Sequence, residues 1–181
     1  MSVLEDQVVT EFALKDRDLI LQVISELTND VLWDWDLATD QVTRNSGFDR
    51  LLGYEPGEFD QGLSGWVGAL HPDDASYVRE SINTAITSGA TRWQCDYRMR
   101  SKDRSYVHIH DTGFLFRDES GKAFRFVGGS RDVTELVRFQ TELKRQADVF
   151  DQAQEAILIL ELDGRVRSWN MSAERIYGWS R

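Results

Sequence analysis

Alternating hydrophobic and polar residues predict an antiparallel β-sheet. In the clearest stretch, residues 93–99, every second residue is apolar and the residues between them are Gln94, Asp96 and Arg98. One face of such a strand is buried and the other faces water. Polar turns separate this segment from its neighbours, and the segments that we interpret as strands are 31–37, 41–45, 93–99, 106–116 and 123–130.

Between the second and third strands the apolar spacing changes to that of helices. Val78, Ile82 and Ile86 recur every four residues, which places them on one helical face. The predicted helices are 47–52 and 75–88, and 63–70 is predicted to be a short helix or turn. Because these helices are segregated from the strands, we predict an α+β fold: a five-stranded antiparallel sheet with short helices on one face.

Two amphipathic helices are predicted to flank this core. Residues 1–29 form the N-terminal one, with an apolar stripe that runs from Val8 to Leu27. The C-terminal one covers residues 136–154, and its heptad-like seam consists of Leu136, Phe139, Leu143 and Phe150. An isolated helix is marginal in water, so each stripe needs a surface to pack on. We expect a homodimer that forms through the flanking helices.

The front of the chain recurs near its end at a constant separation of 125 residues. The identical pairs are Leu37/Leu162, Asn45/Asn170, Arg50/Arg175 and Gly53/Gly178. A fixed period marks a structural unit and its length. We therefore expect a helix over residues 1–29, a complete domain over 30–135, a linker helix over 136–154 and the truncated start of a second domain over 155–181.

Composition narrows the classes of function. The chain has 21 basic and 31 acidic residues and a net charge of −10, which disfavours binding to nucleic acids or to anionic membrane surfaces. No apolar stretch approaches the length of a membrane span. The single cysteine, Cys95, excludes an intrachain disulfide and fits a reducing compartment. We expect a cytoplasmic protein without direct membrane contact.

Motifs for catalysis or metal binding are weak. The sequence has no G-x-S-x-G elbow and no P-loop, and its carboxylates are scattered, so we do not expect an enzyme. His108 and His110 are two residues apart on a predicted strand and therefore point the same way. No third ligand stands out from the sequence, although Asp111 and His71 could approach the two histidines in space. No metal site is assigned.

Five motifs, taken in order, resemble the PAS sensory family, in the subclass with a W-D-L opening and an H-P-D-D element. The motifs are WDWDL at 33–37, LGY at 52–54, HPDD at 71–74, DYRMR at 96–100 and VGGSRDVT at 127–134. The chain departs from the subclass in two places. Asp103-Arg104 replaces a frequent Asp-Gly in a turn, and His108 replaces a frequent Trp on a strand. The second change bears on what a pocket or a dimer face accepts.

The resemblance implies a sensory module in front of a signalling output such as a two-component histidine kinase, a diguanylate cyclase or a phosphodiesterase. A module of this family binds a small ligand or cofactor between sheet and helices and relays a change into the following helix. Asp132, Val133 and Thr134 resemble the family's exit motif and are the expected signal relay. Asp or Thr at this place can also simply cap a helix. The alternative function is a ligand-free dimerisation or protein-interaction module whose core is filled by aromatic residues.

No motif requires a particular cofactor. Some relatives hold haem through a histidine on the long helix, and residues 75–88 contain none, so haem is disfavoured. Flavin-adduct chemistry needs a cysteine on the helical side, whereas Cys95 alternates with apolar residues on a strand. A non-covalent flavin stays open. The candidate pocket residues are Trp66, Cys95, Tyr97 and His108, with the inward or outward direction of His108 undecided.

Overall fold

The structure is a computed structural model that describes residues 31–179 except 46 and 61. The predicted helix over residues 1–29 lies outside the described residues. The chain divides into two compact units, Met1–Thr134 and Glu135–Arg181. Each unit is described by itself.

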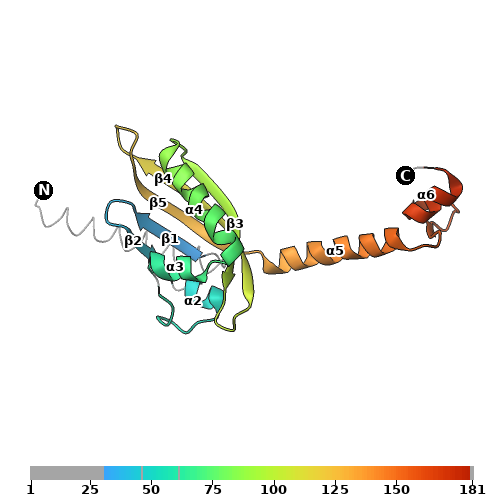
Figure 1. The fold of residues 1–181 in the computed structure, drawn as a ribbon, viewed down its shortest axis with the longest axis horizontal. Coiled ribbons are helices and arrows are strands. Elements are labelled where there is room, and N and C mark those ends of the chain that lie inside the picture. Colours follow the sequence, from blue (N-terminus) through green and yellow to red (C-terminus); the bar gives the residue numbers. More distant parts are fainter. Residues whose placement is uncertain (1–30, 46, 61, 180–181) are drawn as a thin grey trace, which may run out of the picture. The chain divides into compact units, whose positions relative to one another are not determined.

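The first unit contains a five-stranded antiparallel sheet (Figure 1). Its strands are β1 (Val31–Asp36), β2 (Gln41–Arg44), β3 (Arg92–Arg100), β4 (Tyr106–Arg117) and β5 (Ala123–Asp132). They lie in the order β2-β1-β5-β4-β3, so the first hairpin pairs with the last strand. The sheet and its segregated helices confirm the predicted α+β class.

Three helices lie on one face of this sheet (Figure 1). They are α2 (Gly47–Leu52), α3 (Leu63–Ala69) and α4 (Pro72–Thr87). Helix α4 begins at Pro72, earlier than the predicted residue 75. A proline is tolerated at the first helical position because its missing N–H would have no partner there. His71 caps the helix, since its Nδ1 atom accepts a hydrogen bond from the Asp73 amide at 3.1 Å.

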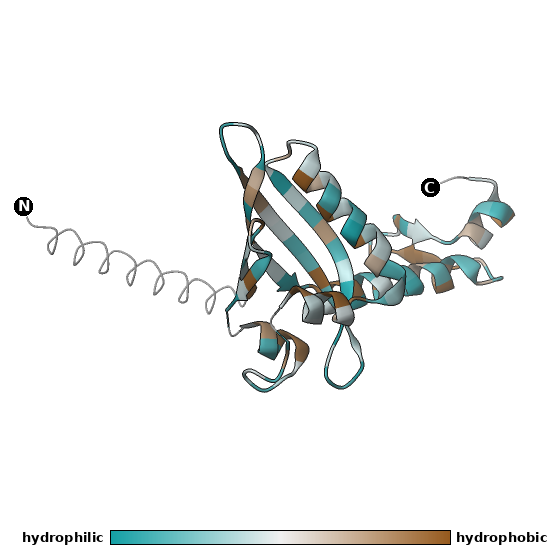
Figure 2. Ribbon diagram, turned by 60° about the vertical axis from the view of Figure 1, so that its left-hand side comes forward, coloured by the Kyte–Doolittle hydropathy of each residue, from teal (hydrophilic) through white to brown (hydrophobic). Residues whose placement is uncertain are grey.

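The core lies between the sheet and these helices. Along β3 the buried residues are the alternating apolar ones, as predicted, and the alternation is visible along the strands in Figure 2. The largest fully buried hydrophobic side chains are Phe48, Phe126, Leu52, Met99, Ile109, Val31 and Val78. Helices and sheet therefore share one continuous core.

The second unit holds helix α5 (Thr134–Gln152, whose first residue belongs to the first unit), strands β6 (Leu158–Leu160) and β7 (Val166–Trp169), and helix α6 (Met171–Tyr177). The two strands form a sheet of their own. All three residues of β6 are exposed. Among the described residues, no helix is long and apolar enough to cross a lipid bilayer.

The sequence repeat reappears as a repeat of contacts. In the first unit, the Asn45 Oδ1 atom accepts a hydrogen bond from the Leu32 amide at 3.2 Å, and the Asn45 amide donates to the Leu32 carbonyl at 3.1 Å. In the second unit, Asn170 and Ile157 make the same two bonds at 3.0 and 3.1 Å. An asparagine thus joins the end of each hairpin to its start, directly before the helix that follows.

Candidate functional site

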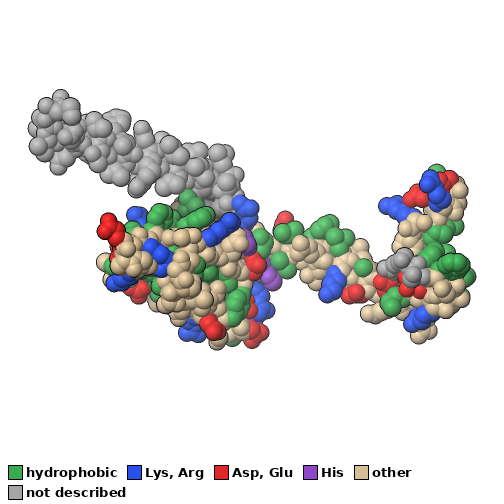
Figure 3. Space-filling view, turned by 90° about the horizontal axis from the view of Figure 1, so that it is seen from above, with side chains coloured by type: hydrophobic (Ala, Val, Ile, Leu, Met, Phe, Trp, Pro, Cys, Tyr) green, Lys and Arg blue, Asp and Glu red, His purple; other side chains and the backbone are tan. Residues whose placement is uncertain are grey.

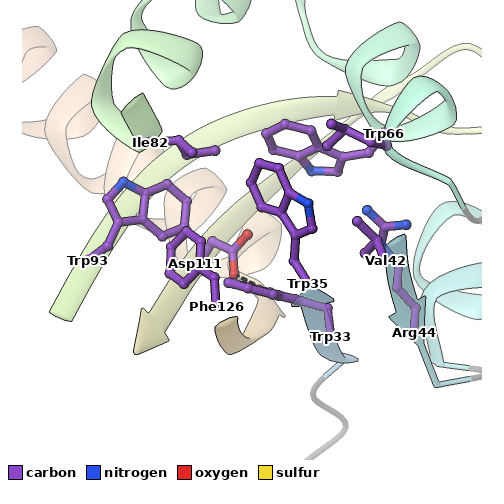
Figure 4. Close-up of a pocket in the computed structure, with 10 residues that line it drawn as sticks. Trp33, Trp35, Val42, Arg44, Trp66, Ile82, Trp93, Asp111 and Phe126 are labelled. Carbon is purple, nitrogen blue, oxygen red and sulfur yellow. Dashed lines mark hydrogen bonds between the residues drawn. The ribbon is translucent and has the colours of Figure 1, made fainter. Parts of the chain in front are cut away.

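A cavity lies between the sheet and the helices of the first unit (Figure 4). Half of its lining residues are aromatic, and the full set is Trp33, Trp35, Val42, Arg44, Leu63, Trp66, Ile82, Trp93, Asp111 and Phe126. The space open to the centres of water-sized molecules is about 40 Å³. One water needs roughly 10–15 Å³ on this measure, so the cavity has room for a small group of atoms.

Asp111 is the buried polar centre of this site, with 4% of its surface exposed. Its Oδ1 atom accepts hydrogen bonds from the Trp33 indole at 2.8 Å and from the Ser130 hydroxyl at 3.1 Å. Its Oδ2 atom accepts one from the Tyr97 hydroxyl at 2.7 Å. Tyr97 in turn accepts a bond from the Trp66 indole at 3.1 Å. A chain of hydrogen bonds therefore joins helix α3 to the sheet through this carboxylate.

Burial sets the protonation behaviour of the site. Burial raises the pKa of Asp111 to about 6, although the hydrogen bonds from Tyr97, Trp33 and Ser130 and the charge of Arg44 act in the opposite direction. Burial and the neighbouring Asp111 raise the pKa of Tyr97 well above its usual value. Burial also lowers the pKa of Arg44. The carboxyl group of Asp111 therefore titrates close to neutral pH.

Two glycines allow Trp33 to reach Asp111. Gly128 lies opposite Trp33 across β1 and β5, and it also pairs with Gly113 of β4. A Cβ atom on Gly128 would come within 2.3 Å of the Trp33 ring, and one on Gly113 within 2.3 Å of the Phe126 ring. The Trp33 indole and the Phe126 ring pack edge to face over these two glycines, with 4.9 Å between the ring centres. We call Gly113 and Gly128 the glycine floor. Side chains at either position would displace the cavity wall.

Two of the four pocket residues suggested by the sequence belong to the site. Trp66 lines the cavity, and Tyr97 connects it to Asp111. Cys95 is buried on the inward face of β3 but does not line the cavity, and burial raises the pKa of its thiol. His108 does not line the cavity, because Ile109 and Asp111 have the inward direction on β4.

The sequence reasoning missed Asp111 as the centre of the site. A signal was available: Asp111 occupies the same alternating register as Ile109 and Leu115, so it is an acidic residue at an inward position. Arg44 was also missed. Arg44 lies on the short strand β2, where Val42 is the one apolar residue that indicates which side chains face inward. A single apolar residue is too little to establish an alternating pattern from the sequence.

The expected relay residues bind strand β4 where the sheet ends. The Val133 amide donates to the His108 carbonyl at 2.8 Å, and the Thr134 hydroxyl accepts from the His108 amide at 2.8 Å. The Asp132 carboxylate accepts from the Thr134 amide at 2.7 Å. We call residues 132–134 the exit. The threonine hydroxyl therefore bonds the sheet, while the aspartate bonds the start of α5.

Two of the sequence motifs meet through an ion pair. Arg98 of the DYRMR motif donates to Asp74 of the HPDD motif from Nε at 2.9 Å and from Nη2 at 2.7 Å. Its backbone amide adds a third bond at 2.9 Å. The hydrogen bond from Arg98 holds the pKa of Asp74 below its usual value. This pair fixes the start of α4 against β3.

The histidines lie apart from the cavity. His110 contacts Asp96 at 2.6 Å on the outward side of the sheet, and His71 packs against Tyr106 at 4.4 Å between ring centres. Over the part of the chain that the structure describes, no group of three or more His, Cys, Asp or Glu residues is arranged to hold a metal ion.

Comparison with protein families gives two matches. Residues 41–129 match a family described as the PAS fold, and residues 144–181 match one described as the PAS domain. The second match covers the region of the sequence repeat.

Two curated proteins are similar over most of this chain. The sensor protein FixL of Bradyrhizobium diazoefficiens is 25% identical over 155 residues, which cover 82% of this chain and 30% of that protein. The probable diguanylate cyclase DgcE of Escherichia coli is 21% identical, over 83% of this chain and 14% of that protein. The chain spans less than a third of the length of these relatives.

Solved structures share the fold. A sensory box histidine kinase/response regulator from Burkholderia thailandensis aligns with a TM-score of 0.63 and 22% identity, over 74% of this chain and 98% of that structure. The N-terminal domain of a diguanylate cyclase with a PAS/PAC sensor from Marinobacter aquaeolei aligns with a TM-score of 0.53 and 24% identity, over 58% and 95%. The two family matches show that the chain belongs to the PAS family, with one PAS domain followed by a partial match to a second.

Proposed function

We propose that this PAS domain is the sensory input of a larger cytoplasmic signalling protein and that it binds a small molecule in the cavity around Asp111. The observation that carries the proposal is the cavity itself: about 40 Å³ of space remains open between four indoles, with a buried carboxylate and Arg44 in its wall. An interior packed only for stability has few voids larger than a water molecule. The ligand is smaller than a flavin, because three fused rings need far more space than the present packing leaves.

The proposed relay runs from β5 through the exit into helix α5. The exit residues Asp132, Val133 and Thr134 bond to one another and to His108, so a shift of β5 changes how α5 begins. Similarity to FixL and to a diguanylate cyclase supports a histidine kinase or a cyclase as the downstream output. A ligand acts on this relay only through different affinities for two arrangements of the exit.

A second function, protein interaction or dimerisation, is favoured by helix α5. Its predicted seam residues Leu136, Phe139 and Leu143 are 55%, 63% and 50% exposed, and hydrophobic side chains gather along this helix in Figure 3. Phe150 is only partly buried. We propose that a second copy of the chain covers the seam, because apolar residues near heptad spacing suit a paired helix.

The ligand proposal is tested by native mass spectrometry and thermal-shift screening with a library of small polar and aromatic compounds. Two variants that add the same bulk at different positions serve as the test and its control. Val42→Phe fills the cavity, whereas Val149→Phe adds the same bulk to an exposed position on α5. We expect compounds that bind one per domain and stabilise the wild type and Val149→Phe, but not Val42→Phe. Binding that survives in Val42→Phe would contradict the cavity as the site, and a folded protein that binds no compound would favour the interaction module.

A further inference from the structure

The carboxylate of Asp111 forms hydrogen bonds with residues from several elements of the domain. Its carboxylate is bonded to Trp33 of β1, to Tyr97 of β3 and to Ser130 of β5, while Asp111 itself belongs to β4. Through Tyr97 it also reaches Trp66 of α3. The Trp33 indole and Ser130 of β5 therefore share one buried acceptor, and the Trp66 indole is joined to it through the Tyr97 hydroxyl.

Ser130 places this network close to the exit. Asp111 and Ser130 are direct partners across β4 and β5, and Ser130 is buried with 2% of its surface exposed. Two residues further on, Asp132 bonds the Thr134 amide, and Thr134 bonds the backbone of His108. His108 is on the same strand as Asp111, three residues before it. The path from the cavity wall to α5 is therefore short and made of hydrogen bonds.

We infer that Asp111 is the positioning residue that couples the state of the cavity to the exit, and that the Ser130 hydroxyl carries this coupling into β5. The inference deepens the proposed function and rests on it for the natural stimulus. The coupling itself is a property of the ligand-free domain, because it requires only that the charge or position of Asp111 change. Protonation of the Asp111 carboxylate is therefore enough to test the coupling.

Protonation of Asp111 is accessible to experiment. Burial raises its pKa to about 6, so the group changes charge in a range where the protein can be studied. The ionisable groups that act on it are Tyr97 and Cys95 of β3 and Arg44 of β2. Tyr97 and Cys95 have raised pKa values, so both stay protonated near pH 6, and an arginine stays charged. Asp111 is therefore the group of this cluster that titrates.

The test is a pH titration of the full chain by NMR, with the indole and backbone N–H signals as readouts. His108 and His110 are replaced by Gln in the background, so that the part of β4 that pairs with the exit carries no imidazole. Trp33 reports on Asp111 directly, and Thr134 reports on the exit. The Trp93 indole, which bonds Ser81, is the internal control.

We expect the Trp33 indole and the Thr134 amide to titrate together with a midpoint near pH 6, while the Trp93 indole does not follow. Asp111→Asn should remove both transitions. Ser130→Ala should keep the Trp33 transition and lose that of Thr134, whereas Thr112→Ala, which removes a hydroxyl on the outward side of β4, should keep both.

The inference is overturned by a Thr134 transition that persists unchanged in Ser130→Ala, or by a wild-type Thr134 signal that does not change with the Trp33 transition. The serine variant decides the matter even if Asp111→Asn does not fold.

Discussion

At the scale of the residue, the buried carboxyl group of Asp111 makes stability depend on pH. Its pKa is about 6 in the folded chain against 3.8 in the unfolded one, so the folded state binds the extra proton between these values. The stabilisation is complete below pH 3.8 and is lost as the pH rises through 6. A shift of this size corresponds to about 3 kcal/mol.

We expect urea denaturation at pH 4.5–8 to show this loss of stability in the wild type and not in Asp111→Asn. Parallel stability profiles for the two proteins would contradict the assignment.

The glycine floor under Trp33 gives a second expectation at this scale. Gly128→Ala places a Cβ atom against the indole and against the Thr112 carbonyl, so we expect it to lower the free energy of unfolding by about 1–3 kcal/mol. The matched control is Gly68→Ala in α3, where, within the described part of the chain, no atom apart from the adjoining residues and the helix backbone lies within 4 Å of the new Cβ. Denaturation with Trp fluorescence measures both variants. Equal stability of the two would show that the floor tolerates a side chain.

Single residues were the hardest level to predict from the sequence. Alternation along β3 correctly buried Cys95 and Tyr97, but it could not tell that only Tyr97 reaches the cavity network. The role of Asp111 depends on donors from three other strands, and no local pattern records which strands become neighbours. His108 directly precedes the buried residue Ile109, and neighbouring side chains on a strand point to opposite faces of the sheet.

At the scale of the element, the junction between β5 and α5 depends on one hydroxyl. Thr134→Val keeps the shape of the side chain and removes the acceptor for the His108 amide. We expect a loss of about 1–2 kcal/mol and faster hydrogen exchange at His108 and in the first turn of α5. Thr141→Val is the control, because that hydroxyl donates to the Val137 carbonyl within the exposed helix. Unchanged exchange at His108 in Thr134→Val would contradict this role of the exit.

Most elements were predictable because their signals are local. The four-residue spacing of Val78, Ile82 and Ile86 and the alternation of β3 each lie within a single segment. The errors occur at the ends. Helix α4 gains a turn because His71 and Pro72 form its cap, and β5 extends to Asp132 because β4 continues to pair with it. Both extensions depend on contacts beyond the segment itself.

At the scale of the whole molecule, the exposed seam of α5 leads to an expectation about oligomeric state. We expect the chain to be a dimer at micromolar concentrations by light scattering, because Phe139 and Leu143 otherwise remain in water. Phe139→Glu with Leu143→Glu should give a monomer whose PAS domain keeps its stability. Thr141→Glu, a charge added to the same helix outside the seam, should remain dimeric. A wild-type monomer at all concentrations would exclude this interface.

The repeat was the strongest prediction that the sequence made at this scale. Asn45 and Asn170 make equivalent bonds, and Gly53 and Gly178 both have a left-handed backbone after a short helix, which few residues other than glycine adopt. Such positions are constrained by backbone geometry, so they survive where side-chain packing diverges. The cavity has no comparable signature, because its walls come from both ends of the domain.

The most direct test of ligand sensing is a titration of the isotope-labelled full chain with a compound found to bind one per domain. The indole signals of Trp33 and Trp66 report on the cavity, and the Thr134 amide reports on the exit. We expect all three signals to move along one saturation curve, and to stay in place when Val42→Phe fills the cavity. Indole signals that saturate while Thr134 remains unchanged would show that the cavity binds a ligand without signalling, and would contradict the sensory role proposed for this domain.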